Sequence, residues 1–422
     1  MTHSPGLRHQ LFASRAFLAA LLLCAAFIVG FAATRIQAPA SLGQPKGMTD
    51  FDAFYVAGAM ARNGKAVQTY DAQATFAAQR AFTGTQSAMP WTYPPPFTVL
   101  MEQFSRLPVG IAFAIFTSLG FLFWLMVMHR LAGAYLPGAV IAVLPTVILN
   151  LRTGQNGFLI AGLFGLALLL HRGGKASAGL PLGLMIVKPH LTAGIGVLTL
   201  LDRRWHALAL AAVIALALLA LATLAYGPAI WPAFLEGLRQ ASEFLAQGHY
   251  QLFRMTSWYA FLRGFDLPAG LALAAQVVSA IAGLALLALT WRARARPHVV
   301  GAAACVASLL FSPYSYDYDL TILGVAVALL ITDMARLARP AELAAMFALC
   351  WWVTGYGLAA NSFLEIAGLN TAALQKSPVP SLAAPALLAL IALAATVLRR
   401  GERGGAREKA SAGAAEMETS PS

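Results

Sequence analysis

Long apolar stretches with almost no charge dominate this sequence and limit what it can fold into. Of the 422 residues, 59% are hydrophobic and only 11% are charged. A soluble domain cannot bury that much apolar surface, so the solvent around most of the chain must be lipid. In lipid every backbone polar group must bond within its own segment, which favours helices. The sequence therefore predicts an all-α polytopic membrane protein.

About twelve apolar runs can be distinguished. The first, residues 16–33, is longer than the core of a signal peptide and follows Arg8 and Arg15. We expect an anchoring helix there, with cleavage as the alternative because small residues follow. Several later runs are shorter than the roughly 20 residues of a straight span, so the four between 135 and 201 are expected to be tilted, re-entrant or buried. These later runs lie near 108–128, 135–150, 157–170, 176–187, 190–201, 205–225, 267–290, 298–312, 319–335, 341–360 and 380–398.

Basic residues gather in short clusters after every second run. Positively charged connections stay in the cytoplasm, so we expect both termini there: residues 1–15, and a tail at 401–422 whose composition predicts disorder. Residues 16–400 then form the membrane domain. The net charge of +12 is a topology signal, and no nucleic-acid partner is expected. The clusters are Arg8/Arg15, His129/Arg130, Arg172/Lys175, Arg203/Arg204, Arg292/Arg294/Arg296, Arg336/Arg339 and Arg399/Arg400.

Two of the outward-facing connections are too long to be simple turns. Residues 34–107 contain acidic residues, glycines and three consecutive prolines, which cannot be helical throughout because proline lacks a backbone donor. Residues 226–266 contain an amphipathic stretch, Ile230 to Ala246, that we expect to lie along the membrane surface. His249, Arg254 and Trp258 also belong to this second loop. Nearly every unusual polar residue of the chain falls in an outward-facing connection.

Asp50 and Asp52 lie a short distance beyond the first apolar run. A partly desolvated carboxylate at the membrane boundary suits a general base, because loss of water raises its proton affinity. The alternative is that one of them caps the helix that continues through Ala57 to Arg62. The residues alone favour the cap.

Lys188 interrupts the apolar segment 176–201. A cation inside a membrane segment is costly and needs a partner, so it indicates a functional group. The alternative is a short outer hairpin from which the lysine reaches the lipid headgroups. The polar turn from Arg152 to Gly157 can present an arginine and two amides to a phosphate or a sugar, although an ordinary loop would look the same.

Tyrosines and aspartates alternate after Pro313. Their aromatic faces and carboxylates suit a sugar, while the alternative is an interfacial aromatic belt with a helix cap. The three cysteines lie inside apolar runs and are expected to be packing residues. The sequence has no His/Glu pair with metal spacing, no phosphate-binding glycine loop and no nucleophile motif, so a donor is expected to arrive through the membrane.

Several short strings follow one another along the chain. They are Asp50-Phe51 with Phe54-Tyr55 and Ala57-Gly58, Gly64, Tyr70-Asp71, Tyr93-Pro94-Pro95, Gly154-Gln155-Asn156, Ala178-Gly179 leading to Lys188-Pro189, Arg203-Arg204-Trp205, and Ser312-Pro313. In this order they resemble glycosyltransferase family 87, the polyprenyl-phosphate-mannose-dependent α-1,2-mannosyltransferases of the GT-C superfamily. The resemblance extends from about residue 10 to 400. Some members have a Ser-Pro-x-Ser-Trp-x-His-His pattern whose histidines are replaced here by Tyr318 and Asp319, so mannose is an inherited assignment.

The resemblance implies a GT-C-type bundle of about twelve transmembrane helices with a long first outer loop carrying short helices. It implies inverting transfer of a hexose or pentose from a polyprenyl-phosphate donor to a hydroxyl of a glycan or glycolipid. The site would face the periplasm from a bacterial inner membrane, with no metal or other cofactor. A transporter or lipid-linked-sugar flippase is the alternative, and a noncatalytic partner in polysaccharide assembly is a third.

The resemblance also implies roles for single residues. In this superfamily an aspartate of the first outer loop acts as base, and Asp50 matches that position better than Asp52 because Phe51 and Phe54-Tyr55 follow it. Lys188, with Arg152 and His190, is expected to bind the donor phosphate. The sugar or the acceptor is expected to bind at Asp52, Tyr55, Tyr93, Gln155, Asn156, Asp317, Tyr318 and Asp319.

Overall fold

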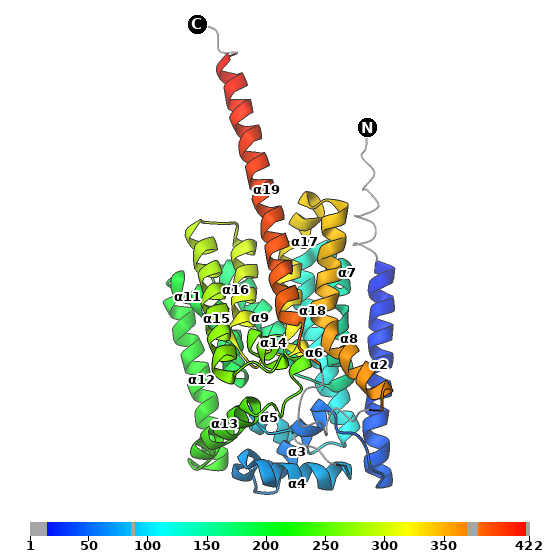
Figure 1. Ribbon diagram of the computed structural model, residues 1–422. Helices are drawn as coiled ribbons and strands as arrows, with labels where there is room; N and C mark the ends of the chain where they lie inside the picture. The colour runs from blue at the N-terminus through cyan, green and yellow to red at the C-terminus, as the bar shows by residue number, and fades with distance from the viewer. Residues whose placement is uncertain (1–14, 86–88, 369–378, 419–422) are drawn as a thin grey trace.

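The computed structural model describes residues 15–85, 89–368 and 379–418, which form helices joined by turns (Figure 1). Within these residues no strand occurs, and the one β-type contact is an isolated antiparallel bridge between Met255 and Tyr316. This confirms the all-α fold class that the apolar runs predict.

Seven of the described helical stretches are long and apolar enough to cross a membrane. The expected count of about twelve transmembrane helices is not reached by these seven and stays a prediction, whereas the polytopic character is supported. The seven comprise α2 (Arg15–Leu42), α6 (Val109–Ala132) continuing into α7 (Leu136–Ala142), α12 (Trp205–Tyr226), α15 (Ala269–Arg292), α17 (Thr321–Leu337), α18 (Pro340–Ile366) and α19 (Ala383–Glu418).

The segment from 144 to 201 is broken into short helices. Its members are α8 (Leu144–Thr153), α9 (Gly157–Arg172), η3 (Ala176–Ala178), α10 (Gly179–Leu184), η4 (Met185–Val187), η5 (Pro189–Thr192) and α11 (Ala193–Leu201). Prolines in the first turns of α8 and η5 explain two of the breaks, because a proline is tolerated only where its missing N–H has no helical partner. Another short apolar helix, α16 (Pro297–Phe311), precedes α17. The broken segment from 144 to 201 lies within residues 135–201, where the run lengths predicted segments too short for straight spans.

The first long connection carries the expected short helices. They are α3 (Asp50–Arg62), η1 (Val67–Tyr70), α4 (Ala72–Thr83) and α5 (Pro95–Phe104), and α3 has the bounds that the sequence predicts. They lie at the end of the molecule opposite the C-terminal end of α19, together with part of the second long connection (Figure 1). Aromatic rings tie them together: Phe54 packs edge-on against Phe97 at 5.2 Å and Tyr93 at 5.2 Å between ring centroids.

The second long connection contains α13 (Ile230–Ala246), η6 (Leu252–Arg254) and α14 (Trp258–Gly264). The bounds of α13 are those predicted for the amphipathic stretch. Its apolar face packs on the first connection: the Phe234 ring lies 5.5 Å from that of Tyr70, and Phe244 lies 6.3 Å from Phe76. The expected position of α13 along the membrane surface stays a prediction.

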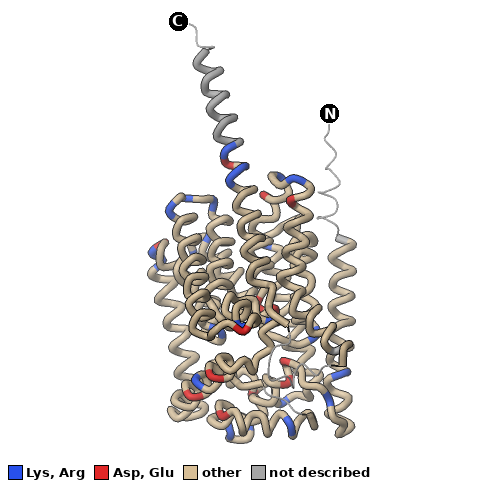
Figure 2. The backbone as a smooth tube through the Cα atoms, in the orientation of Figure 1, with Lys and Arg blue, Asp and Glu red and all other residues tan. Residues whose placement is uncertain are grey.

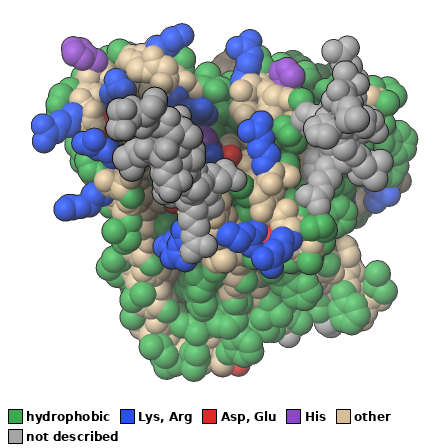
Figure 3. Space-filling model, turned by 90° about the horizontal axis from the view of Figure 1, so that it is seen from above, with side chains coloured by type: hydrophobic (Ala, Val, Ile, Leu, Met, Phe, Trp, Pro, Cys, Tyr) green, Lys and Arg blue, Asp and Glu red, His purple; other side chains and the backbone are tan. Residues whose placement is uncertain are grey.

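Charge is distributed unevenly between the two ends of the molecule. The start of α2 and the C-terminal end of α19 lie on the same side of the molecule (Figure 1). Many Lys and Arg residues lie on this side (Figure 2), and they are visible when the molecule is seen from above (Figure 3). This agrees with basic clusters on one side, whose assignment to the cytoplasm stays a prediction. The helix α19 continues to Glu418, because Ala, Glu, Arg and Lys favour helix. Residues 419–422 lie outside the described residues, and the predicted disorder of the tail at 401–422 remains untested.

Candidate active site

The polar cluster of the protein is built on η7 (Asp317–Leu320), the single turn that leads into α17. Hydrogen bonds from α8 fix its backbone: Thr146 Oγ1 donates to the carbonyl of Asp317 at 2.7 Å, and Asn150 Nδ2 donates to that of Tyr318 at 3.1 Å. At the start of α9, Gly157 approaches so closely that an added Cβ would lie 2.2 Å from the Tyr318 carbonyl oxygen. Helices from an earlier part of the chain therefore hold the aspartates and tyrosines of η7 in place.

The turn between α8 and α9 is the Gly-Gln-Asn string of the sequence. Gly154 ends α8 with a left-handed φ of 67°, a conformation that side chains other than glycine rarely adopt. A Cβ there would also lie within 2.8 Å of the Phe51 and Phe113 side chains. The turn delivers Gln155 and Asn156 as buried side chains facing the site.

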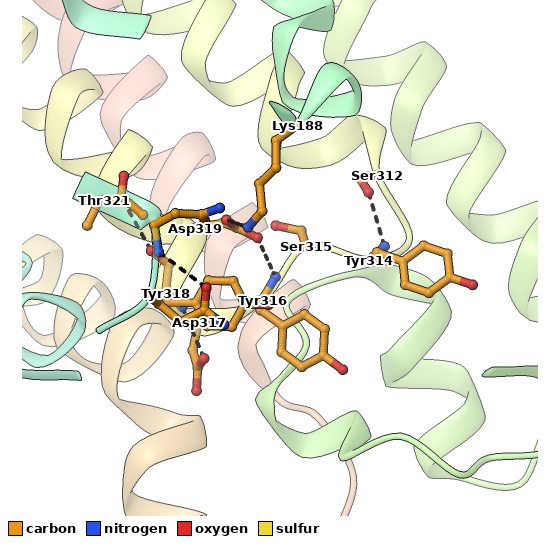
Figure 4. Close-up of polar contacts among 12 residues, drawn as sticks. Lys188, Ser312, Tyr314, Ser315, Tyr316, Asp317, Tyr318, Asp319 and Thr321 are labelled. Atoms are coloured by element: carbon orange, nitrogen blue, oxygen red, sulfur yellow. Dashed lines mark hydrogen bonds and ion pairs between the residues drawn. The ribbon is translucent and has the colours of Figure 1, made fainter. Parts of the chain in front are cut away.

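Lys188 has the buried partner that its position requires. Its Nζ lies 2.7 Å from Oδ1 of Asp319, and both side chains are almost completely buried (Figure 4). The ammonium also faces the rings of Tyr318, at 4.6 Å from the centroid, and Tyr93, at 5.6 Å, distances at which a cation is attracted to an aromatic face. The alternative of a lysine reaching out to headgroups therefore does not describe this residue.

Asp50 lies beside an arginine of the second long connection. Nη2 of Arg254 is 3.5 Å from Oδ2 of Asp50. The same guanidinium donates two hydrogen bonds to Asp317, from Nε to Oδ2 at 3.1 Å and from Nη2 to Oδ1 at 3.2 Å. Arg254 was not among the predicted site residues, because its place in the second long loop gave no indication of which segment it would meet.

Asp52 takes the structural role that the sequence left open between the two aspartates. Its carboxylate accepts hydrogen bonds from the backbone N–H of Thr49 at 2.8 Å and from the Thr49 hydroxyl at 2.9 Å. The other oxygen pairs with Lys46 Nζ at 2.7 Å, and Asp52 is fully buried. Thr49 is thus the N-cap residue of α3, and Asp52 completes the capping box from the third position of the helix, whereas Asp50 has no part in the cap. The predicted contact of Asp52 with a sugar or acceptor stays untested.

Tyr93 lies between the two halves of the cluster. Stacking on Trp91 at 5.1 Å and Phe97 at 4.7 Å fixes its ring, and its hydroxyl donates to Oε1 of Gln155 at 3.4 Å. Burial raises the pKa of Tyr93 well above its usual value, and the nearby carboxylates of Asp319 and Asp50 raise it further. Tyr93 is therefore a neutral hydrogen-bond donor that faces both acidic residues.

Buried polar atoms without a hydrogen-bond partner gather in this region. Within the described chain they include Oδ2 of Asp50, both amide atoms of Asn156 and Nε2 of His190. The Asn156 amide is close enough to Tyr93 to lower the pKa of that phenol, yet neither amide atom makes a hydrogen bond of normal geometry. Since buried polar groups are normally paired, these atoms mark a place prepared for water or a polar ligand.

Two predicted residues lie outside the cluster. Arg152 is exposed at the end of α8. Tyr55 donates from its hydroxyl to the carbonyl of Leu107 at 3.0 Å and packs on Phe82 at 5.5 Å. Their expected roles with phosphate and sugar stay predictions, since neither side chain is brought to η7 by these contacts.

The cluster thus combines three carboxylates with two cations: Asp50, Asp317 and Asp319 with Lys188 and Arg254. In the described parts of the chain no group of three or more His, Cys, Asp or Glu side chains is arranged to hold a metal. A carboxylate without a hydrogen bond on one oxygen can accept a proton. A cation in a poorly hydrated site can neutralise charge on a leaving group. The arrangement therefore suits acid–base chemistry on a hydroxyl next to an anionic group.

Comparison with known proteins gives one match. The sequence model of glycosyltransferase family 87 matches residues 91–313, just over half of the chain. Tyr93, Lys188 and Arg254 lie within the matched region, whereas Asp50 and η7 lie outside it. No curated protein matches, and no solved structure matches. On the family match, this chain, a multi-pass membrane protein, belongs to glycosyltransferase family 87.

Proposed function

We propose that this membrane glycosyltransferase moves a sugar from a polyprenyl-phosphate donor to an acceptor hydroxyl on the periplasmic face. Asp50 removes the proton of the acceptor hydroxyl as that oxygen attacks the anomeric carbon. The bond from this carbon to the phosphate oxygen breaks on the opposite side, which inverts the configuration. The polyprenyl phosphate leaves with the electron pair, and Lys188 neutralises its charge.

The observation that carries this proposal is the convergence of Asp50 and Lys188 on η7. Asp50 reaches it through Arg254 and Asp317, and Lys188 reaches it through Asp319, two residues further along. The Tyr318 ring lies 4.6 Å from the Lys188 ammonium and 5.8 Å from the Arg254 guanidinium. A base and a phosphate-neutralising cation gathered around one turn suit a displacement in which a proton leaves the attacking oxygen while negative charge develops on the leaving oxygen.

One apolar cavity suits a lipid-linked donor, although no residue of the polar cluster lines it. A cavity of about 160 Å³ lies inside the helix bundle and is lined almost entirely by apolar side chains. It extends along α17 from Leu323, one helical turn beyond Asp319, to Met334. α16, α18 and α19 supply other walls. An isoprenoid chain can enter such a space from lipid without losing hydration, whereas a nucleotide cannot.

The two tyrosines of this region suit a sugar. The rings of Tyr316 and Tyr318 are stacked, with centroids 5.2 Å apart and planes 4° apart. Asp319, which replaces a histidine of the pattern found in some family members, pairs with Lys188.

The test is a transfer assay with the purified full-length protein in lipid nanodiscs. Polyprenyl phosphates carrying single hexoses or pentoses are offered with a short glycan or glycolipid acceptor, and products are identified by mass spectrometry. We expect one donor to give a product heavier than the acceptor by one sugar, and nucleotide sugars to give none. Movement of a lipid-linked sugar across liposomes with no bond formed from any donor would favour a flippase instead.

A further inference from the structure

Arg254 lies on a short segment of the second outer loop that crosses η7. The segment is pinned there by its backbone: Met255 forms an antiparallel bridge with Tyr316, and the N–H of Thr256 donates to the carbonyl of Ser315 at 2.8 Å. The Thr256 and Ser315 hydroxyls also meet at 3.0 Å. The backbone next to Arg254 is therefore fixed on the same element that carries Asp317.

The Asp317 carboxylate is an equally fixed anchor for the guanidinium. Its Oδ1 accepts a hydrogen bond from the N–H of Tyr318 at 3.0 Å. The helix α18 packs closely against this ion pair at Gly357. A Cβ added there would lie 2.4 Å from Oδ2 of Asp317 and 3.0 Å from Cα of Arg254. A planar guanidinium held at two atoms by one carboxylate has a defined orientation.

Asp50 is held in a different way from Asp317. Its distance of 3.5 Å from Nη2 of Arg254 is an ion pair and not a hydrogen bond, and Oδ2 has no hydrogen-bond partner. Arg254 thus attracts this carboxylate without occupying the oxygen that a substrate hydroxyl would use. Asp50 begins α3, so the position of its backbone is set by a different element from that of Arg254.

We propose that Arg254, anchored by Asp317, is a positioning residue that holds the Asp50 carboxylate in the orientation needed to take the acceptor proton. This rests on the proposed role of Asp50 as base. Arg254 is less suited to bind the donor phosphate, because two carboxylates already compensate its single charge. Lys188 has one such partner, Asp319.

The charged and titratable groups that face Asp50 come from three elements. They are Arg254 from η6, Asp317 and Tyr318 from η7 with Tyr316 just before it, and Tyr93 before α5. Arg254 is the cation of this set. Without it Asp50 would face the Asp317 carboxylate unscreened, and a neighbouring like charge favours the protonated form of a carboxyl group.

The experiment compares Arg254→Gln, Arg254→Lys and Asp317→Asn with the wild type in the transfer assay. We expect Arg254→Gln to lower kcat by about 10²-fold, the scale of a misplaced reacting group, with an unchanged KM for the donor. The acid limb of its pH–rate profile should move to higher pH, because Asp50 then faces the Asp317 carboxylate without an intervening cation. Arg254→Lys should keep the acid limb of the wild type but not its kcat, because an ammonium cannot hold both carboxylates as a fork does.

Controls and contrary outcomes separate this inference from the proposed function. Arg239→Gln, which removes an exposed arginine of α13, should leave kcat, KM and the pH profile unchanged. Wild-type kcat and acid limb in Arg254→Gln would overturn the positioning role, and a raised donor KM at full kcat would make Arg254 a phosphate ligand instead. If Arg254→Gln does not elute as a folded protein, Asp317→Asn decides through kcat, which should fall because the guanidinium loses its anchor, and a wild-type kcat in folded Asp317→Asn would overturn the positioning role. Full activity of Asp50→Asn would remove the base itself and hence the proposed function.

Discussion

Lys188 and Asp319 are 131 residues apart in the sequence, and their side chains meet at 2.7 Å in a site where both are almost fully buried. Removing two charges from water costs several kcal/mol of desolvation free energy per ion, which their mutual attraction offsets only in part. A packed pair of apolar residues would hold η7 against the residues between η4 and η5 at lower cost. The pair is therefore better explained by what the ammonium does for a ligand than by its contribution to stability.

The first prediction concerns this pair. Asp319→Asn should lower the free energy of unfolding by about 3–5 kcal/mol, because it leaves a buried ammonium without its counter-charge. The same change should tighten donor binding, since the phosphate no longer competes with Asp319 for Lys188. Lys188→Met with Asp319→Leu should recover stability without recovering transfer. Thermal unfolding and donor-binding isotherms measure both effects, and weaker donor binding by Asp319→Asn would contradict the role of Lys188.

The second prediction concerns Asp52. Asp52→Asn removes the counter-charge of the buried Lys46, so the folded protein should lose about 3–5 kcal/mol of stability. The turnover per folded molecule should stay close to that of the wild type, because both Asp52 oxygens are engaged with Thr49 and Lys46. Active-site titration combined with a melting curve separates the two quantities. A folded Asp52→Asn protein with no turnover would give Asp52 the chemical role instead.

The third prediction uses two glycines. Gly157→Ala places a methyl group 2.2 Å from the Tyr318 carbonyl and 2.6 Å from Oδ1 of Asn150, so η7 must shift. We expect a loss of about 1–3 kcal/mol in stability and a fall in kcat, because Asp317 and Asp319 move with η7. Gly196→Ala in α11 meets no atom within 4 Å and should be neutral or slightly stabilising. Equal activity of the two variants would show that the position of η7 is not critical.

The fourth prediction concerns Tyr93. Tyr93→Phe keeps the ring packing and removes the hydroxyl that donates to Gln155. This should lower kcat/KM by about 10-fold, the equivalent of one hydrogen bond of about 1.4 kcal/mol that no longer holds Gln155 in place. Because the folded pKa of Tyr93 is raised, the unfolded chain deprotonates first as pH rises, near its usual value of about 10. Any stability from this residue is thus lost only above that pH. The wild-type and Tyr93→Phe profiles should have the same shape at neutral pH, and a shifted limb there would contradict a neutral phenol.

Local features of the sequence predicted local features of the fold. The helix expected to start at one of the two aspartates and to continue through Ala57 to Arg62 is α3, and the spacing of apolar and charged residues predicted the bounds of α13. The helix count was harder to predict because hydropathy does not locate breaks. The run at 135–150, for example, is divided between α7 and α8 at Val143, just before the proline that lies in the first turn of α8.

The site was predicted only in part, for a physical reason. Burial cost indicated that Lys188 needs a partner, but nothing local identified that partner as Asp319. Arg254 was noted only as a polar residue of the second loop, because its fork with Asp317 depends on how two distant segments cross. The contacts of Asp52 with Thr49 and Lys46 require the folded loop and could not be predicted locally, and the chemical role of Asp50 stays a prediction.

The rate of sugar transfer by Asp50→Asn in a single turnover tests the account most directly. The isosteric amide cannot accept the proton of the acceptor hydroxyl, so the rate should fall by about 10²–10⁴-fold, with donor affinity and unfolding temperature near those of the wild type. A wild-type single-turnover rate in folded Asp50→Asn protein would contradict the assignment of Asp50 as the base.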